Sequence, residues 1–143
     1  MIRTHCMALL VLGTTLLVGC GDGRTPISLG DQVTGQITSA DSYWKSCDSS
    51  NYCNEGYSDR YEITVTAGKT YSVSFSQASA GLQFEDLEHG RLTDTSGTSS
   101  TSSLSPIDSP LTWVPAKGGV NRVGIYTSTE YLPASYSFVI TSR

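Results

Sequence analysis

Residues 60–76, RYEITVTAGKTYSVSFS, carry the clearest structural signal in this 143-residue chain. Apolar side chains occupy every second position on both sides of a central Ala67-Gly68-Lys69 turn. These side chains are Tyr61, Ile63, Val65, Tyr71, Val73 and Phe75. Alternation with a period of two predicts strands with one buried face, and the turn between them predicts an antiparallel hairpin.

Shorter runs of the same kind occur on both sides of this stretch. We expect the strands at residues 32–37, 61–65, 71–76, 82–87, 91–94, 111–114, 120–126 and 135–141. Seven or eight short strands, each with one solvated face, and no helix predict an all-β fold. The expected architecture is a two-sheet antiparallel β-sandwich of the jelly-roll-like kind.

The segment Thr95–Pro110 interrupts this pattern because it consists largely of Ser and Thr. It has no apolar period, so it is either a long loop or a polar edge strand, and we favour the loop.

The N-terminal residues have the features of an export signal. Arg3 precedes an uncharged stretch, Met7–Gly19, that is shorter than the roughly 20 residues a membrane-spanning helix needs. The stretch ends in Leu17-Val18-Gly19-Cys20, which resembles the lipobox of bacterial prolipoproteins. The resemblance implies a signal peptide at residues 1–19, a lipid on Cys20 and a tether at residues 20–30 before a domain at residues 31–143.

Lipidation of Cys20 would anchor the protein to a membrane. A single acyl chain holds only marginally, whereas the two or three chains of a lipoprotein cysteine hold firmly. Gly21 follows Cys20 and Asp22 comes second, an order that in enteric-type bacteria favours the outer membrane. We therefore expect a cell-envelope protein, in the outer membrane if the host has one.

Cys47 and Cys53 are the two cysteines that remain after Cys6 leaves with the signal and Cys20 is lipidated. They bracket a polar, turn-rich stretch, and in an oxidising compartment such a pair forms a disulfide. The alternative, a metal or redox pair, is less favoured because the gap is wider than the usual zinc spacing and no His lies nearby.

Charge and residue types exclude several functions. The chain has 13 acidic and 9 basic residues and no basic run, so nucleic acid is not an expected partner. A Ser-His-Asp triad would have to use His89, the one histidine of the processed chain, which lies in a polar turn. The sequence also has no Gly-x-Ser-x-Gly motif for the nucleophile. The acids Glu85, Asp86 and Glu88 are typical of a solvated face, and Asp41, Asp48 and Asp59 form no EF-hand loop. We expect no catalytic residue, no metal site and no cofactor.

The order of motifs from residue 30 onward resembles the bacterial pre-peptidase C-terminal (PPC) domain, a β-sandwich found beside secreted proteases and in other exported proteins. The similarity rests on Gly35-Gln36-Ile37, Asp41, Asp59 to Gly68 (DRYEITVTAG), Tyr71-Ser72-Val73, Leu111 to Gly119 (LTWVPAKGG) and Tyr136 to Ile140 (YSFVI). The insert with Cys47 and Cys53 and the weak Phe84–Leu87 stretch depart from that family. Some relatives bind calcium or collagen-like substrates, but none of their ligands map onto this chain.

Aromatic residues are the candidate contact residues. Tyr43, Trp44, Tyr52 and Tyr57 gather in the insert, which we interpret as one loop, although Trp44 and one Tyr could instead cover the edge of the sandwich. The sequence therefore favours a non-catalytic, membrane-anchored lipoprotein whose sandwich is a binding or accessory module for a protein or glycan. The alternatives are a small secreted-type hydrolase and a calcium-dependent adhesion module.

Overall fold

The computed structural model describes residues 24–86, 91–93, 99–100, 104–106 and 111–143. These residues form twelve strands and one short 3₁₀ helix. In chain order the elements are β1 (Thr25–Ile27), β2 (Val33–Ile37), β3 (Ser42–Cys47), β4 (Cys53–Val65), β5 (Tyr71–Ala78), β6 (Gln83–Asp86), β7 (Arg91–Thr93), β8 (Ser99–Ser100), β9 (Leu104–Pro106), β10 (Leu111–Val114), β11 (Gly119–Ser128), η1 (Thr129–Tyr131) and β12 (Ala134–Ser142). In the described part of the chain, no helix is long and apolar enough to cross a membrane.

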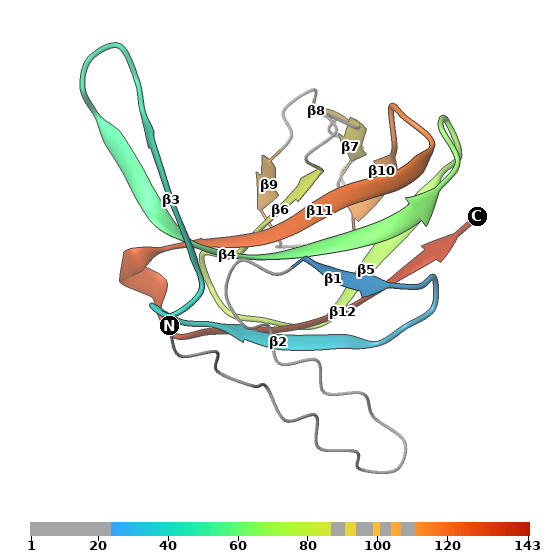
Figure 1. Cartoon of the computed structure of the whole chain (residues 1–143), viewed down its shortest axis with the longest axis horizontal. Coiled ribbons are helices and arrows are strands. Elements are labelled where there is room, and N and C mark those ends of the chain that lie inside the picture. The colour runs from blue at the N-terminus through green and yellow to red at the C-terminus, as the bar shows by residue number, and fades with distance from the viewer. Residues whose placement is uncertain (1–23, 87–90, 94–98, 101–103, 107–110) are drawn as a thin grey trace, which may run out of the picture.

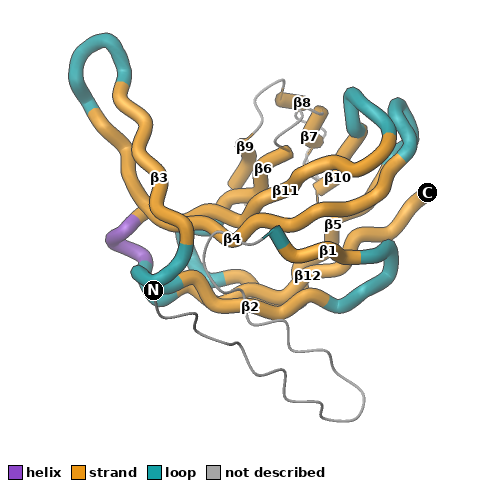
Figure 2. The backbone as a smooth tube through the Cα atoms, in the orientation of Figure 1, coloured by secondary structure: helices purple, strands orange, loops and turns teal. Residues whose placement is uncertain are grey.

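The strands form two sheets that lie face to face (Figures 1 and 2). One sheet has the order β1-β4-β11-β6-β9, with β3 paired onto β4, and the other has the order β2-β12-β5-β10-β7-β8. All pairings between the described strands are antiparallel except that of β1 with β4. The predicted all-β, two-sheet β-sandwich is therefore confirmed.

The inward faces of both sheets supply a single apolar core. Trp113 of β10 is fully buried, and its ring lies 5.6 Å from that of Tyr71 and 6.3 Å from that of Phe84. The other fully buried large side chains are Tyr136, Phe138, Ile37, Ile63, Leu111, Ile125, Ile140 and Val33. Most of these residues come from the alternating runs of the sequence, because alternation places every second side chain on the inward face.

The expected hairpin between residues 61–65 and 71–76 is wrong. The two runs are strands, but β4 pairs with β11 in one sheet and β5 pairs with β12 and β10 in the other. The turn at residues 66–70 therefore carries the chain across the sandwich. The Gly68 amide donates to the Pro115 carbonyl at 3.0 Å, in the neighbouring connection between β10 and β11.

The expected boundary of the domain also needs correction. Residues 20–30 were expected to be a tether, but β1 pairs in parallel with β4, Ile27 is buried, and the Gly30 amide donates to the Ile140 carbonyl at 2.9 Å. The second half of the predicted tether thus belongs to the sandwich. In this pairing Thr25–Ile27 lies beside Tyr61–Ile63 in the second half of β4.

Two segments interpreted as loops contain strands. Within Thr95–Pro110, β8 pairs with β7 and β9 pairs with β6, each at the outer edge of a sheet, so the edge-strand alternative is correct there. Residues 94–98, 101–103 and 107–110 lie outside the described residues. The insert with the two cysteines is a paired hairpin of β3 and β4. The strands of this hairpin mostly have exposed or half-buried side chains before Gly56, which is why the insert shows no apolar period.

Candidate functional site

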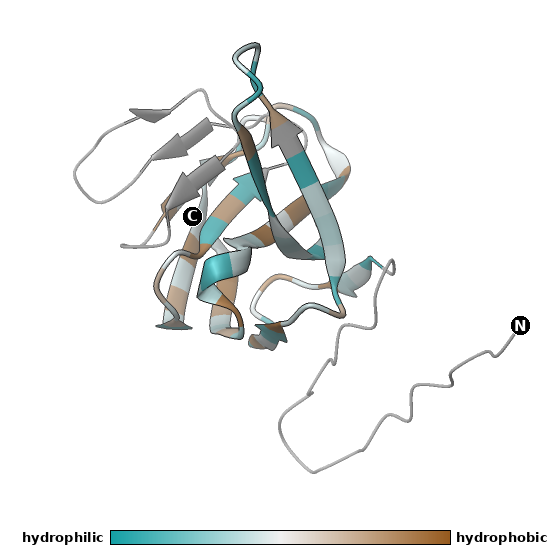
Figure 3. Cartoon of the chain, turned by 90° about the vertical axis from the view of Figure 1, so that its left-hand side faces the viewer, coloured by the Kyte–Doolittle hydropathy of each residue, from teal (hydrophilic) through white to brown (hydrophobic). Residues whose placement is uncertain are grey.

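The hairpin of β3 and the first part of β4 projects beyond the body of the sandwich (Figures 1 and 3). We call residues 42–57 the arm. Its register runs from Ser42 opposite Ser58 to Cys47 opposite Cys53. Past Gly56, β4 pairs with β11 and enters the sandwich, so the arm continues a core strand. The arm is therefore attached to the core through one continuous strand, β4.

The arm leaves the body at a close approach between two strands. A Cβ atom on Gly56 would lie 1.9 Å from the Thr127 carbonyl oxygen of β11, so no other residue type fits there without backbone movement. On the outer face of the same sheet, the Trp44 ring makes an edge contact with Tyr126 at 6.0 Å between centroids. Trp44 therefore fastens the base of the arm to β11.

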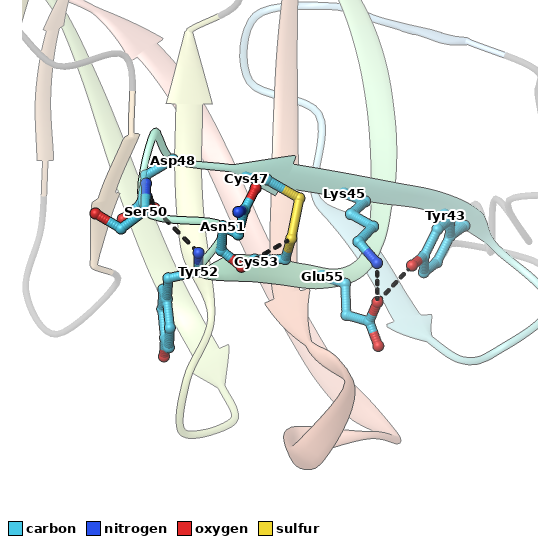
Figure 4. Close-up of a disulfide and its surroundings, with 9 residues drawn as sticks. All are labelled: Tyr43, Lys45, Cys47, Asp48, Ser50, Asn51, Tyr52, Cys53 and Glu55. Atoms are coloured by element: carbon cyan, nitrogen blue, oxygen red, sulfur yellow. Dashed lines mark hydrogen bonds and ion pairs between the residues drawn. A yellow bond between two sulfur atoms is a disulfide. The ribbon is translucent and has the colours of Figure 1, made fainter.

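A disulfide between Cys47 and Cys53 closes the tip of the arm, as the sequence predicts (Figure 4). Asp48 organises the enclosed turn, because one of its carboxylate oxygens accepts hydrogen bonds from the backbone amides of Ser50 at 2.8 Å and Tyr52 at 3.0 Å. Asn51 has a φ of 61°, a conformation that Asn tolerates better than most residues. The tip is thus shaped by covalent and polar contacts within itself.

The four aromatic residues predicted to make contacts are divided between two environments. Tyr52 at the tip is 67% exposed and Tyr43 is 53% exposed, whereas Trp44 and Tyr57 are half-buried. Tyr57 is partly packed against the core and makes an edge contact with Tyr43 at 5.6 Å between centroids. Tyr52 and Tyr43 are therefore the aromatic residues available to a partner, and Trp44 and Tyr57 support them.

Glu55 is a residue of the arm that sequence reasoning missed. Its carboxylate accepts a hydrogen bond from the Tyr43 hydroxyl at 2.6 Å and lies 3.7 Å from the Lys45 ammonium (Figure 4). The hydrogen bond from Tyr43, followed by the charge of Lys45, lowers the pKa of Glu55. The register of the β3–β4 hairpin places Lys45 opposite Glu55, a pairing that was not expected because the insert was interpreted as a loop.

A shallow open hollow of about 250 Å³ lies between the arm and the body. Tyr52, Cys53, Asn54 and Glu55 line one side, and residues 128–130 at the end of β11 and the start of η1 line the other. Its carboxylates are those of Glu55 and Glu130. The hollow is smaller than a typical small-molecule pocket, which favours contact with a surface over enclosure of a ligand.

A buried polar cluster lies below the arm and joins the two sheets. The Tyr136 hydroxyl of β12 donates to the Asp59 carboxylate of β4 at 2.5 Å, and the Tyr61 and Tyr136 hydroxyls are also hydrogen-bonded. Since Tyr136 uses its one hydrogen on Asp59, Tyr61 is the donor in the second bond. A Cβ atom on Gly35 would lie 2.3 Å from the Tyr136 hydroxyl, so the glycine of β2 leaves the space that this hydroxyl occupies.

The environment of Asp59 alters its protonation. Burial raises the pKa of Asp59 to about 6, the hydrogen bond from Tyr136 opposes this shift, and the charge of Asp41 adds to it. Burial also raises the pKa of Tyr61 and of Tyr136, so both remain hydroxyl donors. Asp59 is therefore the group of this cluster that titrates between mildly acidic and neutral pH.

The other acids considered in the sequence have structural partners or lie outside the described residues. Asp41 accepts bonds from the Thr38 amide and hydroxyl, and Asp48 and Asp59 are engaged as described above. Glu85 is on β6, and the side chains of Asp86, Glu88 and His89 lie outside the described part of the chain. Among the described residues, no group of three or more His, Cys, Asp or Glu side chains is placed to hold a metal ion. Cys20 and residues 1–19 are also outside the described residues.

Comparisons with known proteins add little to this geometry. No family model matches the chain, and no curated protein matches it. Among solved structures, the chain is similar to the periplasmic inhibitor of g-type lysozyme, PliG, from Aeromonas hydrophila. The TM-score is 0.43 at 10% sequence identity, over 85% of this chain and all of the other. A likeness at this level assigns neither a family nor a function.

Removal of the disulfide should loosen the arm and leave the sandwich intact. Closing a ring this small favours the ordered arm over its open conformations by about 2 kcal/mol. The arm can open while the sandwich stays folded, because the core residues lie outside the ring. In the Cys47→Ser/Cys53→Ser variant we expect faster proteolytic cleavage at residues 48–52 and an almost unchanged thermal midpoint. A midpoint that falls together with the cleavage resistance would show instead that the arm and the core unfold as one unit.

Replacing Asp59 should change how stability depends on pH. In the folded chain Asp59 keeps its proton up to a pH of about 6, whereas in the unfolded chain it loses the proton near its ordinary value of 3.8. The folded state therefore binds more protons in this window, and stability falls as the pH rises from about 4 to about 6 and stays lower above it.

We expect Asp59→Asn to remove this dependence and to raise the free energy of unfolding at pH 8 by about 1–2 kcal/mol. The full shift would correspond to about 3 kcal/mol, and partial exposure to solvent reduces it. The measurement is urea unfolding of both proteins at several pH values between 4 and 8. A difference between the two proteins that is the same at every pH would contradict the assignment.

Proposed function

We propose that this protein is a non-catalytic lipoprotein of the cell envelope that binds another protein through the tip of the arm. The observation that carries the proposal is Tyr52, a large side chain that is 67% exposed at the end of a projecting hairpin. Exposed aromatic rings are favoured contact residues because they bury a large area with little rotamer entropy to lose. An exposed ring on a projecting hairpin suits insertion into a concave surface of the partner.

Pre-organisation of the arm supports the same proposal. The disulfide, the Asp48 hydrogen bonds and the continuity with β4 hold the tip in one shape before any partner arrives. An ordered loop loses less conformational entropy on binding than a floppy one, so more of the contact energy appears as affinity. The convex shape favours a protein over a glycan, since glycans and other small ligands bind in concave sites.

The lipid anchor is the second part of the proposal and rests on the sequence. Leu17-Val18-Gly19-Cys20 supports lipidation of Cys20, and the residues after it support the outer membrane where the host has one. The stretch between Cys20 and β1 is short, since β1 begins at Thr25. The anchored sandwich would therefore lie close to the membrane surface, with the arm as its most extended element.

We also propose that the sandwich is a divergent relative of the PPC domain. What supports this is that residues of the quoted motifs, Gly35, Asp59, Tyr61 and Tyr136, meet in one hydrogen-bonded cluster between the sheets. A shared origin predicts the same Asp–Tyr–Tyr contact between the corresponding strands of PPC domains.

The alanine variant of Tyr52 tests the binding site. For a protein partner identified by crosslinking, we expect Tyr52→Ala to weaken binding by more than about 1 kcal/mol, a factor of about five. Val120→Ala is the matched control, because Val120 is 63% exposed and pairs with Thr64 at the opposite end of the β4–β11 pairing from the arm. Equal losses in the two variants would remove the arm from the interface.

The proposal also predicts that the protein turns over no substrate. The test is a panel of peptidase and glycosidase substrates offered to the purified full-length protein. Turnover that tracks the protein through purification would replace the binding proposal with the hydrolase alternative.

A further inference from the structure

Asp41 and Asp59 lie on either side of the place where the arm leaves the sandwich. Ser42 and Ser58 form the first cross-strand pair of β3 and β4. Asp41 directly precedes Ser42 and Asp59 directly follows Ser58, so each acid adjoins this pair. The charge of Asp41 contributes to the raised pKa of Asp59, after the larger effect of burial. We call Asp41, Ser42, Ser58 and Asp59 the arm root.

The hydrogen bonds of the two acids keep them at the root. Asp41 is held by the Thr38 amide at 2.7 Å and the Thr38 hydroxyl at 3.0 Å, in the turn that follows β2. Asp59 is held by Tyr136 from the opposite sheet. Neither side chain can swing into solvent without losing these bonds, so both acids stay at the arm root.

The residues around Asp59 come from β4, β12, β11, β2 and the segment before β3. Tyr61 from β4, Tyr136 from β12 and Asp41 from the segment before β3 are the titratable neighbours that act in this cluster. The residue opposite Asp59 on β11 is Ile125, and the residue of β2 beside the Tyr136 hydroxyl is Gly35. Arg60, the next residue in the chain, acts instead on Tyr126. Among the described residues, Asp41 is thus the charged group that acts on Asp59.

We propose that this pair makes the arm root sensitive to protons, so that the first β3–β4 pairs are closed while Asp59 is protonated and open more often once it is ionised. Two like charges placed opposite each other on neighbouring strands weaken the pairing of those strands. When Asp59 carries a proton, the repulsion is absent and the carboxyl group can itself donate to Tyr136. Because burial raises the pKa of Asp59 to about 6, the change falls between mildly acidic and neutral pH.

The root is the end of β3 that can open. At the other end the disulfide ties Cys47 to Cys53, and β4 is continuous from the arm into the core. The contacts at the start of β3 include the Ser42–Ser58 pair, in which the Ser58 hydroxyl donates to the Ser42 carbonyl at 3.4 Å, and the packing of Trp44 on Tyr126. Opening there would change the angle at which the arm presents its tip, and it does not require the sandwich to unfold.

Hydrogen exchange of the purified full-length protein tests the proposal. Exchange is followed by mass spectrometry between pH 5 and pH 7.5, with each rate corrected for its intrinsic dependence on pH. We expect protection of peptides within residues 42–58 to fall by about two- to fivefold, the range expected for a like-charged cross-strand pair, with a midpoint near the pKa of Asp59, about pH 6. Peptides from β5 and β12 serve as the internal reference, since both strands lie in the other sheet.

Two variants separate the acids from other titrating groups. Asp59→Asn should hold the arm protected at every pH, and Asp41→Asn should lower the midpoint and reduce the change. A change that persists in Asp59→Asn would overturn the proposal and assign the effect to another group such as His89. Arm protection that does not vary with pH in the unmodified protein would also overturn it, as would an Asp41→Asn variant that behaves like the parent.

Discussion

Replacing Trp113 by Ala is expected to lower the free energy of unfolding by about 3–5 kcal/mol, the usual loss for a large aromatic side chain in a core. Trp113 has no exposed surface, and its ring contacts Tyr71 of the adjacent strand and Phe84 of the opposite sheet. The variant would therefore lose contacts both within one sheet and between the two sheets. Since a domain is stable by only about 5–15 kcal/mol in total, the variant should unfold at much lower urea concentration, as measured by circular dichroism.

The other tryptophan is the matched control. Trp44 is half-buried, and its ring contact is with Tyr126 on the outer face of the sheet. The indole nitrogens of Trp44 and Trp113 are both buried without a hydrogen-bond partner, so this cost is common to the two and the expected difference comes from the smaller burial of Trp44. We expect Trp44→Ala to cost about 1–2 kcal/mol, in keeping with the loss of part of a buried side chain. Equal losses for the two variants would mean that the arm base is as much a part of the core as Trp113.

Replacing Cys20 by Ala is expected to abolish membrane attachment. In the proposed lipoprotein the Cys20 thiol would accept the diacylglyceryl group, and an Ala at that position cannot form the thioether. Each buried methylene of an acyl chain contributes about 0.8 kcal/mol, so the loss of two or three chains changes partitioning by many orders of magnitude. The measurement is detergent-phase partitioning together with incorporation of labelled palmitate.

Cys6→Ala is the control for this experiment, because Cys6 lies in the segment predicted to be removed. It should partition and incorporate label like the parent. A Cys20→Ala protein that still enters the detergent phase would contradict the proposed anchor. Density-gradient separation of the membranes of a host with two membranes then tests the outer-membrane assignment.

The sequence predicts which face of a strand is buried much better than it predicts which strand lies beside it. Residues 61–65 and 71–76 show their inward faces through alternation, and the structure places those faces in the core. Their assignment to one hairpin is nevertheless wrong, because the turn between them crosses from one sheet to the other. Alternation carries no information about the partner strand, which the closure of the whole sandwich determines.

The candidate site was likewise predicted only in part. The Cys47–Cys53 pair could be predicted from compartment and spacing, whereas the pairing of β3 with β4 could not, because the insert has no apolar period. The sequence does not reveal that Trp44 packs on Tyr126 or that Asp59 contacts Tyr136, since both partners are far away in the chain. Such contacts depend on how β4 lies against β11 and β12, so they appear only when the fold is known.

Site-specific photo-crosslinking in living cells is the most direct test of the claim that the arm tip binds a protein. A photoreactive benzophenone amino acid replaces Tyr52 in one protein and Val120 in another, two positions of similar exposure at opposite ends of the β4–β11 pairing. The account predicts one defined protein adduct from position 52 and none from position 120. Adducts from position 120 alone, the same adducts from both positions, or no adduct from position 52 would contradict it.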